Sequence, residues 1–104
     1  MKKTHAWLVS SNGRDYQLNQ GQTTIGRAAS NDILIADDPT VSALHAKIVA
    51  ENGQFRLYDL GSTKGIKVNQ RWMRGPLLLA PDDQIQLGDQ TVLQFVTANK
   101  NNRF

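Results

Sequence analysis

The chain has 104 residues, of which 39% are hydrophobic and 20% charged, and 12 Lys and Arg against 9 Asp and Glu give a net charge of +3. This composition predicts one globular domain with a modest core and excludes a disordered chain. Cysteine is absent, no apolar run approaches the roughly 20 residues of a membrane helix, and Met1 to Ala6 begin no signal peptide, so we expect a cytoplasmic domain without disulfides.

In the first half of the chain, alternating polar and apolar residues predict short β-strands. Asn12-Gly13 separates the first two strands, and this pair favours a tight hairpin turn. A loop of about seven residues separates the next two strands. The strands expected here are His5–Ser10, Asp15–Asn19, Gln22–Ile25 and Ile33–Ile35.

The second half continues the same β pattern. Two alternating runs flank Asn52-Gly53, which is the strongest short-range hairpin signal in the sequence. Trp72 and Met73 are expected to pair briefly, and Asn99 to Phe104 form a polar tail, so the domain is expected to span residues 1–98. The remaining strands expected are His45–Glu51, Gln54–Leu60, Ile66–Val68, Leu77–Leu79, Gln84–Leu87 and Gln90–Thr97.

About ten short strands at regular spacing, with no helical period, predict an all-β sandwich or barrel. In such folds the sheets hold the loops at one end in place while those loops stay in solvent. Functional residues are therefore expected in these loops.

Catalysis and metal binding find little support in these loops. Ser42 and His45 are three residues apart, but no Gly-x-Ser-x-Gly nucleophile motif occurs. The adjacent carboxylates Asp37-Asp38 and Asp82-Asp83 stand beside prolines, as turn formers do. Two histidines without cysteine make no metal cluster, and the segment 61–65 departs from a nucleotide-binding loop because a strand follows it. We expect no enzyme, no metal and no cofactor.

Anion binding fits the loops better. Arg27 offers a planar fork for phosphate oxygens, and Ser42 and Thr63 add hydroxyls. The turn 61–65 can present backbone N–H groups to an anion. Each residue also has a plain structural interpretation: Arg27 as a surface charge, the two hydroxyls as turn formers, and His45 as a satisfied buried side chain.

A series of short motifs spans the chain from the strand of Trp7 to that of Phe95. In this order and spacing the set resembles the forkhead-associated (FHA) domain family, although each motif alone is weak. The motifs are Ile25-Gly26-Arg27, Ser30-Asn31-Asp32-Ile33, Asp38-Pro39, Val41-Ser42 with His45-Ala46, Asp59-Leu60-Gly61-Ser62-Thr63, Gly65, Val68-Asn69, and Asp83 with Leu87-Gly88-Asp89.

The resemblance implies a sandwich of about eleven mostly antiparallel strands that binds phosphothreonine peptides through loops at one end. By position, Arg27 matches the arginine that meets phosphate or peptide backbone. Ser42 matches the phosphate-binding serine, and Thr63 the residue that holds phosphate from the neighbouring loop. Asn69 matches a residue that orders the loops and meets the peptide backbone.

The resemblance also implies a supporting role for four residues. His45 matches a histidine that buttresses the site without touching ligand. Gly26, Gly61 and Gly65 match positions where the shape of the backbone matters.

Three residues depart from the family pattern. Lys64 replaces a usual Asn, which removes an acceptor for the peptide and adds a cation that can reach phosphate. Ala43 stands where Arg or Asn is common, and Ile66 replaces a usual Thr, a change we interpret as packing. The three phosphate-binding residues are present, whereas the peptide-reading positions, Ala43 among them, are altered.

The sequence therefore predicts a non-enzymatic module whose partner is a phosphothreonine-containing protein, either a Ser/Thr kinase or its substrate. No nucleic-acid or membrane partner is expected. One alternative is an FHA-like domain used for phospho-independent association or self-assembly. Another is a small nucleic-acid-binding β-barrel, which is disfavoured because only 7% of the residues are aromatic and the basic residues are spread along the chain.

Overall fold

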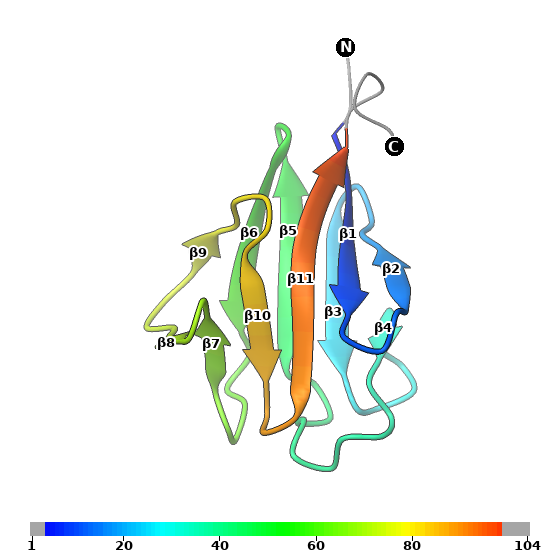
Figure 1. The fold of residues 1–104 in the computed structure, drawn as a ribbon, viewed down its shortest axis with the longest axis vertical. Coiled ribbons are helices and arrows are strands. Elements are labelled where there is room, and N and C mark those ends of the chain that lie inside the picture. The colour runs from blue at the N-terminus through cyan, green and yellow to red at the C-terminus, as the bar shows by residue number, and fades with distance from the viewer. Residues whose placement is uncertain (1–3, 99–104) are drawn as a thin grey trace.

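Eleven strands form two sheets that lie face to face (Figure 1). The computed structural model describes residues 4–98, so the polar tail expected at 99–104 lies outside the described residues. The strands are β1 (His5–Ser10), β2 (Asp15–Gln17), β3 (Gln22–Gly26), β4 (Ile33–Leu34), β5 (Ala46–Glu51), β6 (Gln54–Asp59), β7 (Ile66–Val68), β8 (Arg71–Trp72), β9 (Leu77–Leu78), β10 (Gln84–Leu87) and β11 (Thr91–Ala98). The prediction of a mostly antiparallel sandwich is confirmed.

The larger sheet has the strand order β2-β1-β11-β10-β7-β8, and the smaller sheet has the order β4-β3-β5-β6-β9. In the larger sheet β1 and β11 pair antiparallel along six residues, with His5 opposite Ala98. In the smaller sheet β3 and β4 run parallel, with Ile25 opposite Ile33. β8 is the last strand of the larger sheet, and β9 is the last strand of the smaller one. Both lie at the same side of the sandwich (Figure 1).

The hairpin of β5 and β6 shows how the sequence produces the fold. Asn52 and Gly53 have φ angles of 56° and 78°, which are the positive values that a two-residue hairpin turn needs. This turn places Ile48 opposite Leu57, and both side chains are buried. The hairpin predicted around Asn52-Gly53 is confirmed.

The core lies between the two sheets and is made of alternate side chains from both. Phe55 of the smaller sheet meets Phe95 of the larger one, with ring centroids 5.5 Å apart and planes tilted by 58°. Full burial of one such side chain stabilises a fold by about 1.5–3 kcal/mol. Around this pair the fully buried residues include Leu8, Ile25, Ile48, Leu57, Ile85, Leu87 and Leu93.

Some predicted strand ends differ from the structure by one or two residues. The strand expected at Asp15–Asn19 ends at Gln17 because Asn19 closes the next turn: its backbone N–H donates to Thr23 Oγ1 at 2.8 Å, and its side chain donates to the Gln22 carbonyl at 2.9 Å. The brief strand expected at Trp72 and Met73 lies one residue earlier.

The loops β3–β4, β4–β5, β6–β7 and β10–β11 gather at one end of the sandwich (Figure 1). Three of them carry the predicted phosphate-binding residues. Residues 4–98 include no helix long and apolar enough to cross a membrane.

Candidate functional site

Ser42 in the β4–β5 loop lies where three loops meet. Its carbonyl oxygen accepts a hydrogen bond from the Arg27 N–H at 3.0 Å, and its Oγ accepts one from the Thr63 N–H at 3.0 Å. These bonds bring together the three residues that the sequence selected as anion-binding candidates. Because both donors are backbone amides, these bonds hold the backbones of the three loops beside one another at Ser42.

The Arg27 side chain is exposed and is oriented by the β4–β5 loop. Its Nε donates to the Val41 carbonyl at 3.0 Å. Within residues 4–98 the recorded ion pair joins Lys64 to Asp89, so no described carboxylate lies within 4.0 Å of this guanidinium. The two terminal nitrogens of Arg27 therefore present a positive, hydrogen-bonding edge to solvent.

His45 connects the β4–β5 loop to the β6–β7 loop and is completely buried. Its Nδ1 accepts the Ser42 N–H at 3.0 Å, so Nε2 carries the proton and donates to the Gly65 carbonyl at 2.9 Å. Both ring nitrogens are engaged with backbone groups, and the Ser42 hydroxyl contacts Thr63 instead of the ring. Ser42 and His45 are therefore not arranged as a nucleophile and its base.

The β6–β7 loop is shaped by its own side chains. The Asp59 carboxylate accepts the Ser62 N–H at 2.9 Å, and Ser62 Oγ accepts the Gly65 N–H at 3.0 Å. Gly61 and Gly65 have φ angles of 72° and 78°, a region that favours glycine. Sequence reasoning gave Asp59 no role, although a short polar residue before a glycine turn is a recognisable signal.

Lys64 extends from this loop beside Thr63. Its Nζ lies 3.7 Å from Asp89 Oδ2, and the two side chains are 48% and 58% exposed. Such an exposed pair contributes little to stability, about 0–1 kcal/mol. Lys64 is therefore free to exchange Asp89 for a stronger anion.

Gly26 allows the β3 strand end to approach the β4–β5 loop closely. A Cβ atom at this position would lie 2.3 Å from the Ala43 carbonyl oxygen. That oxygen accepts hydrogen bonds from the Ala28 N–H at 3.1 Å and from Asn31 Nδ2 at 2.6 Å. Ala43 thus holds the two loops together through its backbone, while its methyl group is exposed.

Asp38 is a structural centre, although the sequence indicated only a turn former within the Asp38-Pro39 motif. It is buried; its Oδ1 accepts the Thr40 N–H at 2.9 Å, and its Oδ2 accepts the Thr91 hydroxyl at 2.7 Å and the Gln90 N–H at 3.2 Å. Burial alone raises the pKa of Asp38, but the hydrogen bonds from Thr40, Thr91 and Gln90 outweigh it and lower the pKa to about 2. The carboxylate therefore ties the β4–β5 loop to the β10–β11 turn.

Asn69 lies at the far end of β7 from Gly65, away from the residues around Ser42. Its Nδ2 donates to Asp83 Oδ1 at 2.8 Å, and its Oδ1 accepts the Gln84 N–H at 2.9 Å. The side chain thus orders the β7–β8 turn against the β9–β10 loop, and none of its recorded bonds reaches Arg27, Ser42 or Thr63. Its contact with peptide stays a prediction. Ile66 is buried in the core, as a packing residue would be.

Comparison with known proteins gives a consistent family. The model of the FHA domain matches residues 23–88. The chain is 41% identical over 76 residues to the oxoglutarate dehydrogenase inhibitor of Corynebacterium efficiens, and this match covers 73% of this chain and 52% of that protein. It is 37% identical over 89 residues to the glycogen accumulation regulator GarA of Mycolicibacterium smegmatis, and this match covers 86% of this chain and 54% of that protein.

A solved structure from a study of phosphothreonine-dependent FHA domain interactions superposes with a TM-score of 0.83 at 31% identity, covering 88% of this chain and 95% of that one. The chain spans about half the length of the curated relatives named above. The shared part is therefore the sandwich with its loops.

Proposed function

Since the chain belongs to the FHA domain family, we propose that it is a non-catalytic module that binds phosphothreonine in partner proteins through Arg27, Ser42 and Thr63. The convergence of Arg27 and Thr63 on Ser42 carries the proposal, because residues from three loops meet there at the surface of the domain. The solved structure with 31% identity comes from a study of FHA domain interactions that depend on phosphothreonine, which supports the same ligand here.

The charges and hydrogen bonds of the site suit a phosphate dianion. Arg27 supplies a guanidinium fork. Ser42 Oγ accepts the Thr63 N–H, so its own hydrogen remains a donor for a phosphate oxygen. Lys64 adds a second cation once it leaves Asp89. Each charge-assisted bond contributes about 1.5–3 kcal/mol, and three or four of them, less the entropy cost of association, correspond to micromolar binding.

Lys64 and Ala43 shape how the peptide around the phosphate is read. Lys64 has no acceptor for a peptide N–H, and the Ala43 methyl offers no hydrogen bond. The module therefore depends more on the phosphate than on the peptide backbone. Asn69, with its amide already engaged, is proposed to support the adjacent turn and to meet the peptide only at its edge.

His45 and the glycines support this site without touching the ligand. His45 fixes the distance between the loops of Ser42 and Gly65. Gly26 permits the close approach of the Ala43 carbonyl, and Gly61 and Gly65 allow the bent β6–β7 loop. We infer that these residues pre-organise the phosphate donors, which lowers the entropy cost of binding.

The partner we propose is a Ser/Thr kinase or one of its substrates in the cytoplasm. The two curated relatives named above are an enzyme inhibitor and a regulator of glycogen accumulation, so a regulatory role for this module is consistent with them. The extra methyl of phosphothreonine, if buried, adds about 0.8 kcal/mol over phosphoserine.

A peptide-library titration tests the proposal. Fluorescence anisotropy should show binding of phosphothreonine peptides, much weaker binding of phosphoserine peptides and no binding of unmodified ones. Arg27→Ala should abolish binding, whereas Arg14→Ala, an exposed arginine in the β1–β2 turn, should leave it unchanged. Equal binding of phosphorylated and unmodified peptides would refute the proposal and favour phospho-independent association.

A further inference from the structure

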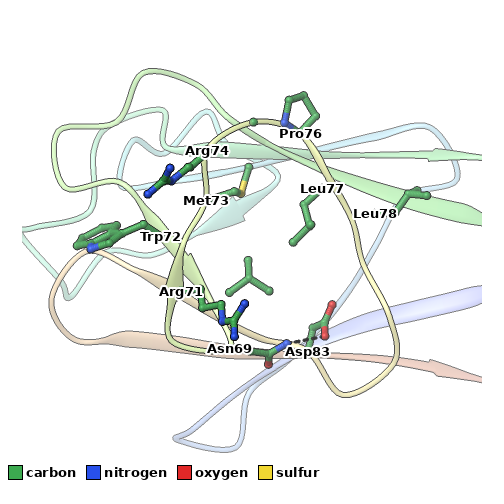
Figure 2. A pocket seen from close by; sticks show the side chains of 11 residues that line it. Asn69, Arg71, Trp72, Met73, Arg74, Pro76, Leu77, Leu78 and Asp83 are labelled. Carbon is green, nitrogen blue, oxygen red and sulfur yellow. Dashed lines mark hydrogen bonds between the residues drawn. The ribbon is translucent and has the colours of Figure 1, made fainter.

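A groove of about 670 Å³ opens at the side of the sandwich where the two sheets end together. Figure 2 shows the chain from Arg71 to Leu78 curving around this groove, with Asn69 and Asp83 along its other side. Its lining comes mainly from β7, β8, β9 and the loop between β8 and β9. Asn69 and Asp83, which follow β7 and β9, complete it. None of the residues bonded around Ser42 lines it.

The interior of the groove is apolar. Val68 of β7 is nearly buried, and the half-buried Met73 packs against the core beside it. Leu77 and Leu78 of β9 are 37% and 43% exposed. With Trp72 they make up three of the five large hydrophobic side chains recorded as exposed in residues 4–98. Such a concentration of exposed apolar surface on a small domain indicates a binding surface.

The rim of the groove is positively charged. Arg71 and Arg74 are exposed, and the one ion pair recorded for the described part of the chain, between Lys64 and Asp89, involves neither of them. Asp83 faces the groove, but its two oxygens already accept hydrogen bonds from Asn69 Nδ2 at 2.8 Å and from the Ala80 N–H at 2.8 Å. Two guanidinium groups beside an apolar interior favour a ligand with both carboxylates and aliphatic side chains.

We propose that this groove docks an acidic, aliphatic-rich segment of a partner protein, without any phosphate. An aliphatic or aromatic side chain of the partner packs on Val68 and Met73 beside Leu77, whose side chain points into the groove (Figure 2). Its flanking Asp or Glu residues pair with Arg71 and Arg74. This proposal does not depend on phosphothreonine binding at Ser42.

The surroundings of Trp72 favour a protein over a nucleic acid. Lys67 Nζ lies 4.6 Å from the centre of its ring and covers one face. The ring edge also lies close to Gly65, where an added Cβ would be 3.0 Å from Trp72 Cζ3. Lys67 therefore already occupies one face of the ring, and the aliphatic interior of the groove offers no second aromatic surface for stacking bases.

The groove also lies next to the candidate phosphate site. Trp72 contacts Gly65 from the groove side, while the Gly65 carbonyl accepts the His45 hydrogen bond on the other. One partner protein can therefore occupy both sites at once, with the β6–β7 loop between them. Two linked contacts raise the overall affinity through the effective concentration of the second.

Phage display of random peptides tests the proposal, because displayed peptides carry no phosphate. The full chain is immobilised, and peptides of about twelve residues are selected on it. We expect enriched sequences to combine Asp and Glu with Leu, Ile, Met or Phe. A synthetic copy of such a peptide should bind about tenfold more weakly, or worse, to the double variant Arg71→Glu/Arg74→Glu, and binding should weaken as salt rises.

Two controls separate the groove from the rest of the surface. Arg14→Glu makes the same charge change in the β1–β2 turn and should leave peptide affinity unchanged. Arg27→Ala should also leave it unchanged, although the same variant loses phosphothreonine peptides. Leu77→Ser should weaken peptide binding without altering phosphothreonine binding, and thermal unfolding of each variant shows whether it remains folded.

Three results would overturn the proposal. The first is enrichment of peptides without an excess of acidic residues. The second is binding that the double variant at Arg71 and Arg74 does not change, because the peptide then binds elsewhere. The third is displacement of the peptide by single-stranded oligonucleotides that themselves bind through these arginines, which would assign the groove to nucleic acid.

Discussion

Replacing His45 by alanine would remove the connection between two loops of the candidate site. The ring is fully buried, and its two nitrogens serve the Ser42 N–H and the Gly65 carbonyl. A buried polar group left without a partner costs about 1–3 kcal/mol, so two of them cost roughly 2–6 kcal/mol before any cavity is counted. A domain of this size has a free energy of unfolding of about 5–15 kcal/mol. We therefore expect His45→Ala to lose a large part of the stability, measured by urea unfolding.

His45→Phe separates hydrogen bonding from packing. The phenyl ring fills a similar volume but neither accepts the Ser42 N–H nor donates to the Gly65 carbonyl. If hydrogen bonding dominates, this variant should be almost as unstable as His45→Ala and should bind phosphothreonine peptides more weakly. A His45→Phe protein as stable as the unmodified one would refute the reasoning, because the two bonds would then contribute nothing.

Three further outcomes follow from the geometry and charge of the site. In Gly26→Ala the added Cβ would lie 2.3 Å from the Ala43 carbonyl oxygen. This variant should lose roughly 1–3 kcal/mol of stability in urea unfolding and bind phosphopeptides more weakly. An unchanged unfolding midpoint would contradict this. The pKa of Asp38 is lowered to about 2 in the folded state, so its contribution to the free energy of unfolding is complete above pH about 4 and is lost as the pH falls toward 2. On the order of 2 kcal/mol of this acid-sensitive stability should disappear in Asp38→Asn, measured by unfolding across this pH range. An acid profile identical to that of the unmodified protein would contradict this. Affinity for phosphothreonine peptides should fall below pH about 6, where the phosphate loses its second charge, so a flat titration from pH 8 to 5 would argue against dianion binding.

The strands could be predicted because alternation along the chain is a local property. In β6 the buried residues Phe55 and Leu57 alternate with the exposed Arg56, and the Asn52-Gly53 turn fixes the hairpin before it. Ends were less predictable because side chains compete for them. Asn19 bonds to its own turn instead of extending β2, and nothing in the alternation signals that choice.

The site could be predicted only in part. Arg27, Ser42 and Thr63 have side chains whose chemistry is visible in the sequence, and the structure brings them together. Asp38 shows the limit of such reasoning, because its bond to Thr40 is local but its bond to Thr91 depends on how the two sheets stack. The groove at β8 and β9 was missed for the same reason, since two strand ends from different sheets form it.

The pairing of β1 with β11 has a consequence for how the chain acquires its structure. His5 lies opposite Ala98, so this pair of neighbouring strands in the larger sheet joins an early and a late part of the domain. The smaller sheet can assemble from β3, β4, β5, β6 and β9 while the larger sheet still lacks its central strand. Vectorial synthesis therefore leaves the edge of β1 that faces away from β2 unpaired until β11 emerges, and such distant pairings slow folding. During that interval the unpaired edge of β1 is a site at which another chain can add a strand.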